Sequence, residues 1–560
     1  MSETEKSPVD VSVASGSANH GGEKILGDKL FYLALAVSSV FLSLTLWFDF
    51  GSDQALYYYL AWAWKKYHML PYAGVYSGDL PGIIIIHRLA IDLFGESALG
   101  FRFFDFLAQL SSAAMIYFFA KKLSRSSWAG LMAGAIYSIF YYGLHYFGGE
   151  RDSFVFWMLM LAATAGLVMK DGSFLRVTVV GLLLGCCLLT KPPFGLCWAV
   201  FGLWFLAEGI RPRPLRIWIE LSVFVFSCFL PALIFVFIYW RLGYLKILYT
   251  ETLWLQMEVY SHIKHLSLTG KLARSALTIF SMLGYYPVIM SAGVLGFLAM
   301  LVREKSPEER KVFWIVLGLI ATCVACLLMQ IINMPYHRAP PMGLISIFAG
   351  CGVAVMGEQL KPKAKPWLGK VAPLILYGAI ISALFFSTEK SVINFSMKYA
   401  FRNLDRAYKG SQDYSMLVNN MWNQRQVAEY LKPLLRPGDQ VEVFGCYPFL
   451  SCLLNRKPVN SFPSVYNLLM RHSDGVYRPQ QLKWIEEYSE AVIKARPRFF
   501  IIASICIECE VHNWNMPETT LQKNMQVWFP ALYDFFSNNY KLINQVGELE
   551  IYEWETGKAE

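Results

Sequence analysis

Charged residues are scarce in this sequence. Lys, Arg, Asp and Glu make up 16% of its 560 residues, whereas 55% of the residues are hydrophobic. The mean hydropathy is +0.38. A soluble domain usually contains about 25% charged residues, and one aqueous core could not bury so much apolar surface. The composition therefore excludes an ordinary soluble protein and predicts a polytopic α-helical membrane protein.

Motifs of several common chemistries are absent too. We find no internal repeat, no glycine-rich phosphate loop in the C-terminal part and no convincing Ser/His/Asp arrangement. No two acids or histidines have a diagnostic metal-ligand spacing, so we expect no obligatory cofactor, with a divalent metal left open. The net charge of +9 reflects basic loops between apolar segments, so nucleic acid is not an expected partner.

Apolar segments recur along the first two thirds of the chain. A helix needs roughly 17–25 apolar residues to cross the hydrocarbon of a bilayer. We predict about 11 transmembrane helices, at residues 31–48, 103–120, 127–144, 154–169, 175–190, 194–208, 217–239, 279–302, 312–332, 341–357 and 371–387.

Four basic loops set the predicted orientation. They are residues 121–125, 211–216, 303–311 and 361–370, and all fall on one side of the eleven-span arrangement. Cytoplasmic loops are enriched in Lys and Arg, so that side is assigned to the cytoplasm. The C-terminus is then predicted to lie outside, in the periplasm or the extracellular space. We expect a multi-pass protein of a bacterial inner (plasma) membrane.

Three regions follow from this arrangement. Residues 1–30 are predicted to be a disordered cytoplasmic tail, and residues 31–390 a transmembrane catalytic domain. The first external loop, 49–102, is expected to form short interfacial helices at 53–66 and 81–94. Residues 391–560 are predicted to be an extracytoplasmic α/β domain, with helices at 423–435 and 479–495, strands at 440–445 and 498–504, and a closing hairpin near 541–554.

Cysteines occur in two settings. Seven of the 11 lie in or beside apolar segments and are expected to pack there. The other four are in the exported region, where one or two disulfides are expected with the pairing left open. These four are Cys446, Cys452, Cys506 and Cys509.

Acidic and basic side chains converge on the predicted external face. A carboxylate there can act as general base, and cations can hold a departing phosphate. We take Asp53 or Asp152 as the base. The candidate substrate- or phosphate-binding residues are Asp79, Arg88, Glu150, Arg151, Lys191, His337 and Arg338. Structural alternatives are helix capping by Asp53 and Asp79, snorkelling of Lys191, packing of His337, and pairing of Arg151 with Glu150 or Asp152.

The order of short motifs resembles that of family 39-type glycosyltransferases. These motifs are Asp53-Gln54, Asp79-x-Pro81, Leu93-Phe94-Gly95 with Arg102, Asp152, Leu189-Thr190-Lys191, and His337-Arg338 to Pro341. Members of that family are GT-C-fold membrane enzymes, similar to protein O-mannosyltransferases and lipid A aminoarabinose transferases. The resemblance covers about residues 30–390.

The resemblance implies inverting transfer of a sugar from a polyprenyl-phosphate donor to a lipid, glycan or protein acceptor. By that likeness Asp53 matches the catalytic acidic residue of the first loop, Asp152 matches the second acidic position, and Lys191 matches a basic residue near the donor phosphate. Two positions depart from the pattern: Gln54 stands where many members have Glu, and Leu80 where they have a cation.

Two other functions stay open. One is a glycan polymerase or ligase that uses lipid diphosphate donors, and the other is a lipid-linked substrate transporter or flippase. Transporters commonly show inverted repeats and polar groups at the membrane midplane. Here the polar groups lie at one face and no repeat is found, which favours an enzyme.

Overall fold

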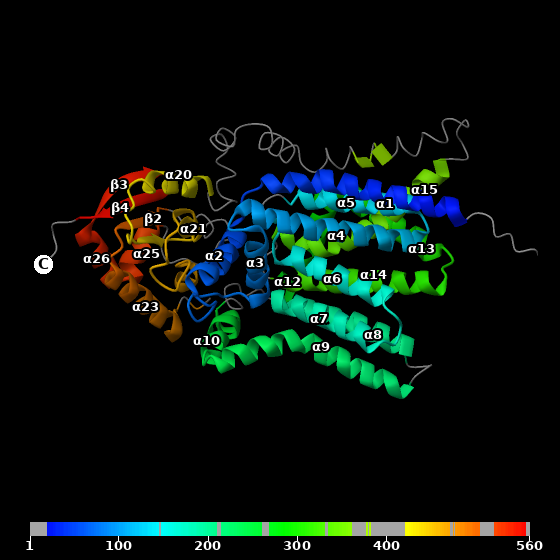
Figure 1. Cartoon of the computed structure of the whole chain (residues 1–560), viewed down its shortest axis with the longest axis horizontal. Coiled ribbons are helices and arrows are strands. Elements are labelled where there is room, and N and C mark those ends of the chain that lie inside the picture. The colour runs from blue at the N-terminus through cyan, green and yellow to red at the C-terminus, as the bar shows by residue number, and fades with distance from the viewer. Residues whose placement is uncertain are drawn as a thin grey trace, which may run out of the picture.

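The computed structural model describes residues 20–560 except 145–146, 210–213, 260–267, 331–333, 361–376, 379, 382–420, 471–473, 475, 505–519 and 556–560. An elongated bundle of helices makes up most of the molecule, and a smaller α/β domain covers one end of it (Figure 1). The bundle and the α/β domain each have a large buried hydrophobic cluster.

Eleven helices of the bundle are defined among the described residues. Their sequences are rich in Leu, Ala, Phe and Val, so their stability comes from packing against one another and from intrahelical hydrogen bonds. They are α1 (His20–Ser43), α4 (Ala98–Ser124), α5 (Ser127–Tyr142), α6 (Arg151–Val168), α7 (Phe174–Thr190), α8 (Cys197–Gly209), α9 (Pro214–Arg241), α12 (Leu268–Tyr285), α13 (Pro287–Val302), α14 (Pro307–Met329) and α15 (Ala339–Leu360).

These helices lie at the positions of ten of the predicted spans, but not all of them are long enough to cross a membrane alone. Six helices, α1, α4, α6, α9, α14 and α15, are long and apolar enough to cross a membrane, which agrees with a multi-pass membrane protein. Helices α5, α7 and α8 are apolar but have only 16, 17 and 13 residues. Helices α12 and α13 meet at a bend of 99° and count as a seventh span only if taken together. The predicted span 371–387 lies mostly outside the described residues.

Proline accompanies two interruptions of the helices: the break between α7 and α8, which the separate predicted spans 175–190 and 194–208 anticipate, and the bend between α12 and α13, which they do not. A 3₁₀ turn at Pro192–Leu196 separates α7 from α8, and Pro287 begins α13 just after the bend. Proline lacks an amide hydrogen and fixes φ, so it interrupts a continuous helix. The N-terminal prediction was also partly wrong, because α1 already begins at His20, inside the predicted tail. Residues 1–19 lie outside the described part.

Two helices within residues 49–102 match their predicted positions in the sequence. Helix α2 spans Ser52–Tyr67 and α3 spans Pro81–Phe94. Both are largely buried, because α2 packs against α3 and against the C-terminal domain. Their position at a membrane interface stays a prediction. The segment after α9 forms α10 (Leu245–Tyr249), a π-helical turn (Thr250–Trp254) and α11 (Leu255–Glu258).

The C-terminal domain is an α/β unit with a four-stranded sheet. The strand order is β1-β2-β4-β3, in which only β1 and β2 run parallel. All of β2 is buried, so this strand forms the centre of the domain. Its elements are α20 (Met421–Leu431), β1 (Val441–Phe444), α21 (Phe449–Leu454), α22 (Tyr466–Leu469), α23 (Pro479–Ala495), β2 (Phe499–Ala503), α25 (Leu521–Trp528), α26 (Pro530–Asn539), β3 (Tyr540–Val546) and β4 (Leu549–Trp554).

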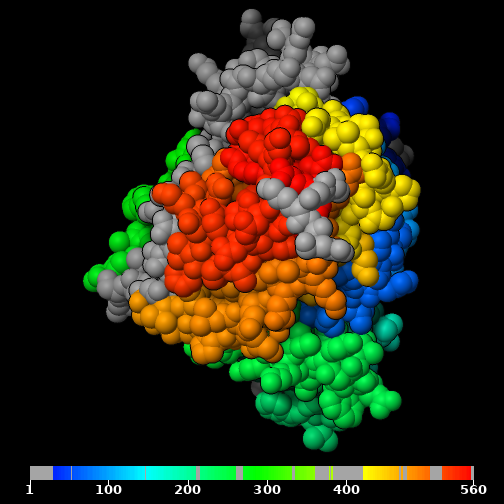
Figure 2. Space-filling model, turned by 90° about the vertical axis from the view of Figure 1, so that its left-hand side faces the viewer, coloured from blue at the N-terminus to red at the C-terminus, as the bar shows by residue number. Residues whose placement is uncertain are grey.

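The C-terminal domain rests on the end of the bundle that carries α2 and α3 (Figures 1 and 2). Arg425 of α20 forms a two-pronged ion pair with Asp49, with N–O distances of 2.9 and 3.1 Å. Phe449 of α21 packs edge-on against Phe50. The domain is therefore attached directly beside the start of α2.

The predicted basic loops meet at the other end of the bundle. Arg125 pairs with Glu309, and Arg303 donates to the carbonyl of Ser124 at 2.6 Å. Lys311 pairs with Glu208. The described basic loops thus share one end, as the topology predicts.

Two of the four cysteines predicted to form disulfides lie in the described part of the C-terminal domain. Cys446 and Cys452 are both unbonded, and the Cys446 Sγ lies 3.0 Å from the Ser464 Oγ. Cys506 and Cys509 lie outside the described residues. Disulfides in this domain therefore stay a prediction.

Candidate active site

Asp53 lies in the first turn of α2 and contacts a residue from the far end of the sequence. The Tyr336 hydroxyl donates to the Asp53 Oδ2 at 2.8 Å. Tyr336 belongs to a 3₁₀ turn, Pro335–Arg338, which leads into α15. The N-cap of α2 is Gly51, not Asp53. The Asp53 carboxylate therefore makes a specific tertiary contact and does not merely cap a helix.

Asp152 and Lys191 form a buried ion pair. The Lys191 Nζ lies 2.5 Å from the Asp152 Oδ2 and also donates to the Gln330 Oε1 at 2.8 Å. The Asp152 Oδ1 has no hydrogen-bond partner in the part of the chain that the structure describes. Burial lowers the pKa of Lys191, and the charge of Asp152 opposes that shift. Lys191 is held inside the protein and does not extend to the surface.

A close contact of α3 with α7 helps to place Lys191. Gly82, in the first turn of α3, packs on the end of α7, where a Cβ would lie 2.7 Å from the Thr190 nitrogen. Any larger residue at this position would push the helices apart. The small residue after Pro81 therefore allows the loop containing Lys191 to approach α3.

Arg151 connects the first loop to α6. Its guanidinium pairs with the Asp79 carboxylate and lies over the Tyr57 ring, 5.6 Å from the ring centre. Asp79 is therefore its ion-pair partner, and the alternative pairing with Glu150 or Asp152 is not the one observed.

Glu150 precedes α6 and is almost completely buried, with 1% of its surface exposed. Its Oε2 has no hydrogen-bond partner among the described residues. Burial is the main cause that raises the pKa of Glu150 well above its ordinary value, and the nearby charge of Asp53 adds to the shift. This position favours a protonated carboxyl.

Arg102 of α4 forms hydrogen bonds with both the segment around Asp53 and the segment before Glu150. It donates to the Gln54 Oε1 at 2.7 Å, to the Gly148 carbonyl at 2.7 Å and to the carbonyls of Phe48 and Asp49. Gln54 in turn donates to the Gly148 carbonyl at 2.5 Å. An ionised glutamate could accept from Arg102 but could not donate to that carbonyl. Gln54 therefore joins the first loop to the segment before Glu150.

Comparison with known proteins identifies the architecture. Residues 80–235 match the family profile described as dolichyl-phosphate-mannose-protein mannosyltransferase. The structure of ArnT from Cupriavidus metallidurans bound to undecaprenyl phosphate superposes with a TM-score of 0.53 at 12% identity, covering 95% of this chain and 98% of ArnT. The apo form of that ArnT gives 0.54 at 11% identity, with 94% and 98% covered. This chain has the GT-C fold.

A second GT-C protein of known structure also superposes on this chain. The Archaeoglobus fulgidus oligosaccharyltransferase, tethered to an acceptor peptide, gives a TM-score of 0.50 at 11% identity, covering 93% of this chain and 72% of that one. No curated protein matches the sequence significantly. The resemblance inferred from short motifs is thus confirmed. The profile match includes Arg151, Asp152 and Lys191 but begins after Asp53 and Asp79.

Three predicted site residues lie at the margin of the cluster or outside it. Arg88 pairs with Asp92 at 2.8 Å on the partly exposed side of α3 and stacks over Trp64, so the structure does not bring it to Asp53. His337 is buried, and its Nδ1 accepts from the Met334 amide at 3.3 Å. The Arg338 guanidinium lies over the Tyr285 ring. His337 and Arg338 thus support the turn that presents Tyr336.

Sequence reasoning missed Tyr336, which lies between Asp53 and Lys191 in this cluster. Besides bonding Asp53, its ring lies 5.7 Å from the Lys191 Nζ. The signal was present, because Tyr336 directly precedes the His337-Arg338 motif. Attention to charged residues alone overlooked a neutral hydrogen-bond donor. Tyr57 and Gln330 were missed for the same reason.

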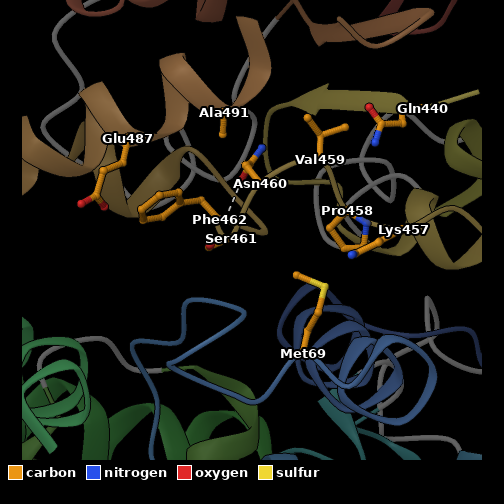
Figure 3. A pocket seen from close by; sticks show the side chains of 10 residues that line it. All are labelled: Met69, Gln440, Lys457, Pro458, Val459, Asn460, Ser461, Phe462, Glu487 and Ala491. Carbon is orange, nitrogen blue, oxygen red and sulfur yellow. Dashed lines mark hydrogen bonds between the residues drawn. The ribbon is translucent and has the colours of Figure 1, made fainter. Parts of the chain in front are cut away.

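A cavity of about 480 Å³ lies away from this cluster, between the C-terminal domain and Met69 (Figure 3). None of the predicted site residues lines it. Its lining residues are Met69, Gln440, Lys457, Pro458, Val459, Asn460, Ser461, Phe462, Glu487 and Ala491. Among the described residues, no group of three or more His, Cys, Asp or Glu side chains is arranged to hold a metal.

Proposed function

We propose that the protein is an integral membrane glycosyltransferase that transfers a sugar from a polyprenyl-phosphate donor to a lipid, glycan or protein acceptor outside the cytoplasm. The observation that carries the proposal is the joining of Asp53, Asp152, Arg151 and Lys191 in one cluster of a GT-C fold. The undecaprenyl phosphate bound to ArnT supports the donor class, and the acceptor peptide on the oligosaccharyltransferase fits an external acceptor.

Asp53 is the better base of the two candidates. Asp152 is completely buried and paired with Lys191, whereas Asp53 is only partly buried and receives a neutral donor from Tyr336. A base must reach the proton that it removes, so the more accessible carboxylate suits that role. Asp152 then serves to hold Lys191 in place.

The reaction proceeds as a single displacement. Asp53 takes the proton of the acceptor hydroxyl, and the acceptor oxygen bonds to the anomeric carbon from the face opposite the phosphate. The bond from that carbon to the phosphate oxygen breaks, and its electron pair leaves with the lipid phosphate. Arg151 and Lys191, already fixed by Asp79 and Asp152, stabilise the growing negative charge. The scheme requires no cofactor.

The location follows from the same proposal. The cluster lies at the end of the bundle covered by the C-terminal domain (Figure 1). We place that end at the outer face of a bacterial inner (plasma) membrane and the described basic loops in the cytoplasm. The donor then reaches the cluster from the outer leaflet.

Replacement of Asp53 tests the assignment. Purified Asp53→Asn protein, given a radiolabelled polyprenyl-phosphate sugar and a lipid extract of host membranes, should transfer sugar at least about 100-fold more slowly, because general bases contribute roughly 10²–10⁴-fold. Asp92→Asn is the control, because Asp92 lies on the partly exposed side of α3 and pairs with Arg88. Wild-type rates in Asp53→Asn would reject Asp53 as the base.

A further inference from the structure

Four consecutive residues of the first loop, Tyr76 to Asp79, are each held by another part of the chain. The Tyr76 amide donates to the Ser461 carbonyl of the C-terminal domain at 2.7 Å. The Ser77 amide donates to the Glu251 Oε2 at 2.9 Å. The Gly78 carbonyl accepts from Gln256 at 2.9 Å. Asp79 then pairs with Arg151, so the segment ends in the proposed active site.

The side chain of Tyr76 belongs to the C-terminal domain in its packing. Only 1% of its surface is exposed, and it is part of the hydrophobic cluster of that domain. Its ring centre lies 5.1 Å from that of Trp484 and 5.5 Å from that of Phe462. A residue of the first loop is thus inserted into the core of another domain.

The backbone of Asp79 is also held by two earlier residues of the same loop. The Tyr72 hydroxyl donates to the Asp79 carbonyl at 2.6 Å, and the Asp79 amide donates to the Ser77 hydroxyl at 3.3 Å. Three residues of extended chain span about 10 Å at most. A shift of the Tyr76 backbone should therefore also shift the Asp79 backbone. Misplacement of a reacting group by about 1 Å can cost 10²-fold in rate.

We propose that the C-terminal domain positions Arg151 through Tyr76 and Asp79. Tyr76 is a positioning residue, since it touches no reacting atom in this scheme. The inference rests on the proposed function, in which Arg151 stabilises the departing phosphate. It gives the C-terminal domain a part in catalysis beyond covering the bundle.

The test is a double-mutant cycle in the full-length protein. Tyr76→Ala should lower kcat at least about ten-fold because the loop loses its anchor, whereas Tyr76→Phe keeps the ring contacts and the backbone hydrogen bond and should stay within about two-fold of the wild type. In the Asp79→Asn background, Tyr76→Ala should cause almost no further loss, because coupled residues act non-additively. Tyr533→Ala removes a half-buried tyrosine of α26, at the far side of the same domain, and should leave kcat unchanged (Figure 1).

Phe462→Leu provides a second route if Tyr76→Ala does not fold. It weakens the anchor from the side of the C-terminal domain and should lower kcat in the wild type but not in Asp79→Asn. An unchanged kcat in both anchor variants would overturn the inference, as would losses that simply multiply with that of Asp79→Asn. Absence of transfer by the wild type would instead reject the proposed function.

Discussion

The charged side chains of the cluster differ in what each one contacts. Asp53 accepts a hydrogen bond from the Tyr336 hydroxyl, and Asp152 accepts one from the Lys191 ammonium group. The Oε2 of Glu150 has no hydrogen-bond partner among the described residues. Burial therefore makes Glu150 the carboxyl that resists ionisation. Different environments for similar groups are how enzymes assign acid and base roles.

For single residues, the sequence predicted which side chains lie near one another, but not which of them form ion pairs. It placed Asp53, Asp152, Arg151 and Lys191 at one face, and the structure brings them together. The partner of Arg151 is Asp79, 72 residues away in sequence, and a pairing of that kind depends on how α3 packs against α7 and α7 against α6. Spacing in the sequence carries no such information.

Removal of the Tyr336 hydroxyl should slow transfer. In Tyr336→Phe, Asp53 loses the donor that orients its carboxylate. A hydrogen bond to a charged group contributes about 1.5–3 kcal/mol, so we expect kcat to fall roughly 10- to 100-fold. The measurement is steady-state transfer over a range of donor concentrations.

Tyr540→Phe is the matched control for this prediction. That buried tyrosine donates to the Pro497 carbonyl at 2.6 Å within the C-terminal domain, away from the cluster. Equal rates for Tyr336→Phe and the wild type would show that the hydroxyl does not orient the base.

Among the elements, short helices with clear end signals were predicted most accurately. Pro81 and Gly95 bound α3, and Pro479 begins α23, so both helices match the sequence prediction. The long apolar segments were harder. Hydropathy does not show the bend between α12 and α13, which depends on local backbone geometry. The division of α7 from α8 was predicted, because Pro192 and Pro193 mark it in the sequence.

Strand β1 carries a buried acid whose protonation should affect the stability of the C-terminal domain. Glu442 accepts from the Tyr488 hydroxyl at 2.5 Å and from the Asn460 amide at 3.0 Å. Burial raises the pKa of Glu442 from 4.5 to about 7, although both hydrogen bonds oppose the shift. The folded state thus binds this proton more tightly than the unfolded state does.

The sign of the pH dependence follows from that difference. Stability from the protonated carboxyl is complete below pH 4.5 and is lost as the pH rises toward 7, by up to roughly 3 kcal/mol. Glu442→Gln stays neutral, so we expect it to remove this loss. Hydrogen exchange of the β1 and β2 amides in the full-length protein, corrected for intrinsic rates, should show less protection at pH 8 than at pH 5 in the wild type only.

Glu429→Gln, which changes an exposed acid of α20, is the control and should keep the wild-type pH dependence. If Glu442→Gln and the wild type lost protection equally with rising pH, Glu442 would not be the responsible group.

For the whole molecule, the sequence predicted the division into a membrane bundle and a C-terminal α/β domain, because composition and element length change along the chain. It did not predict how the two parts are joined. The ion pair of Arg425 with Asp49 links residues 376 positions apart, and Tyr76 enters the core of the other domain. These contacts use ordinary residue types that have no distinctive local pattern.

The orientation in the membrane is the remaining prediction at this scale. Cytoplasmic loops are enriched in Lys and Arg, so Glu304→Cys, in the exposed basic loop between α13 and α14, should react with an impermeant maleimide only after spheroplasts are permeabilised. Glu490→Cys, on the exposed face of α23, should react in intact spheroplasts. The unsubstituted chain measures the background from native cysteines.

The opposite labelling pattern would have a specific consequence. The C-terminal domain covers the end of the bundle that carries the Asp53 cluster, so both must lie on the same side of the membrane (Figure 1). Labelling of Glu304→Cys from outside would therefore place Asp53, Arg151 and Lys191 in the cytoplasm. The proposed transfer to an external acceptor would then be rejected, even if the cluster itself were catalytic.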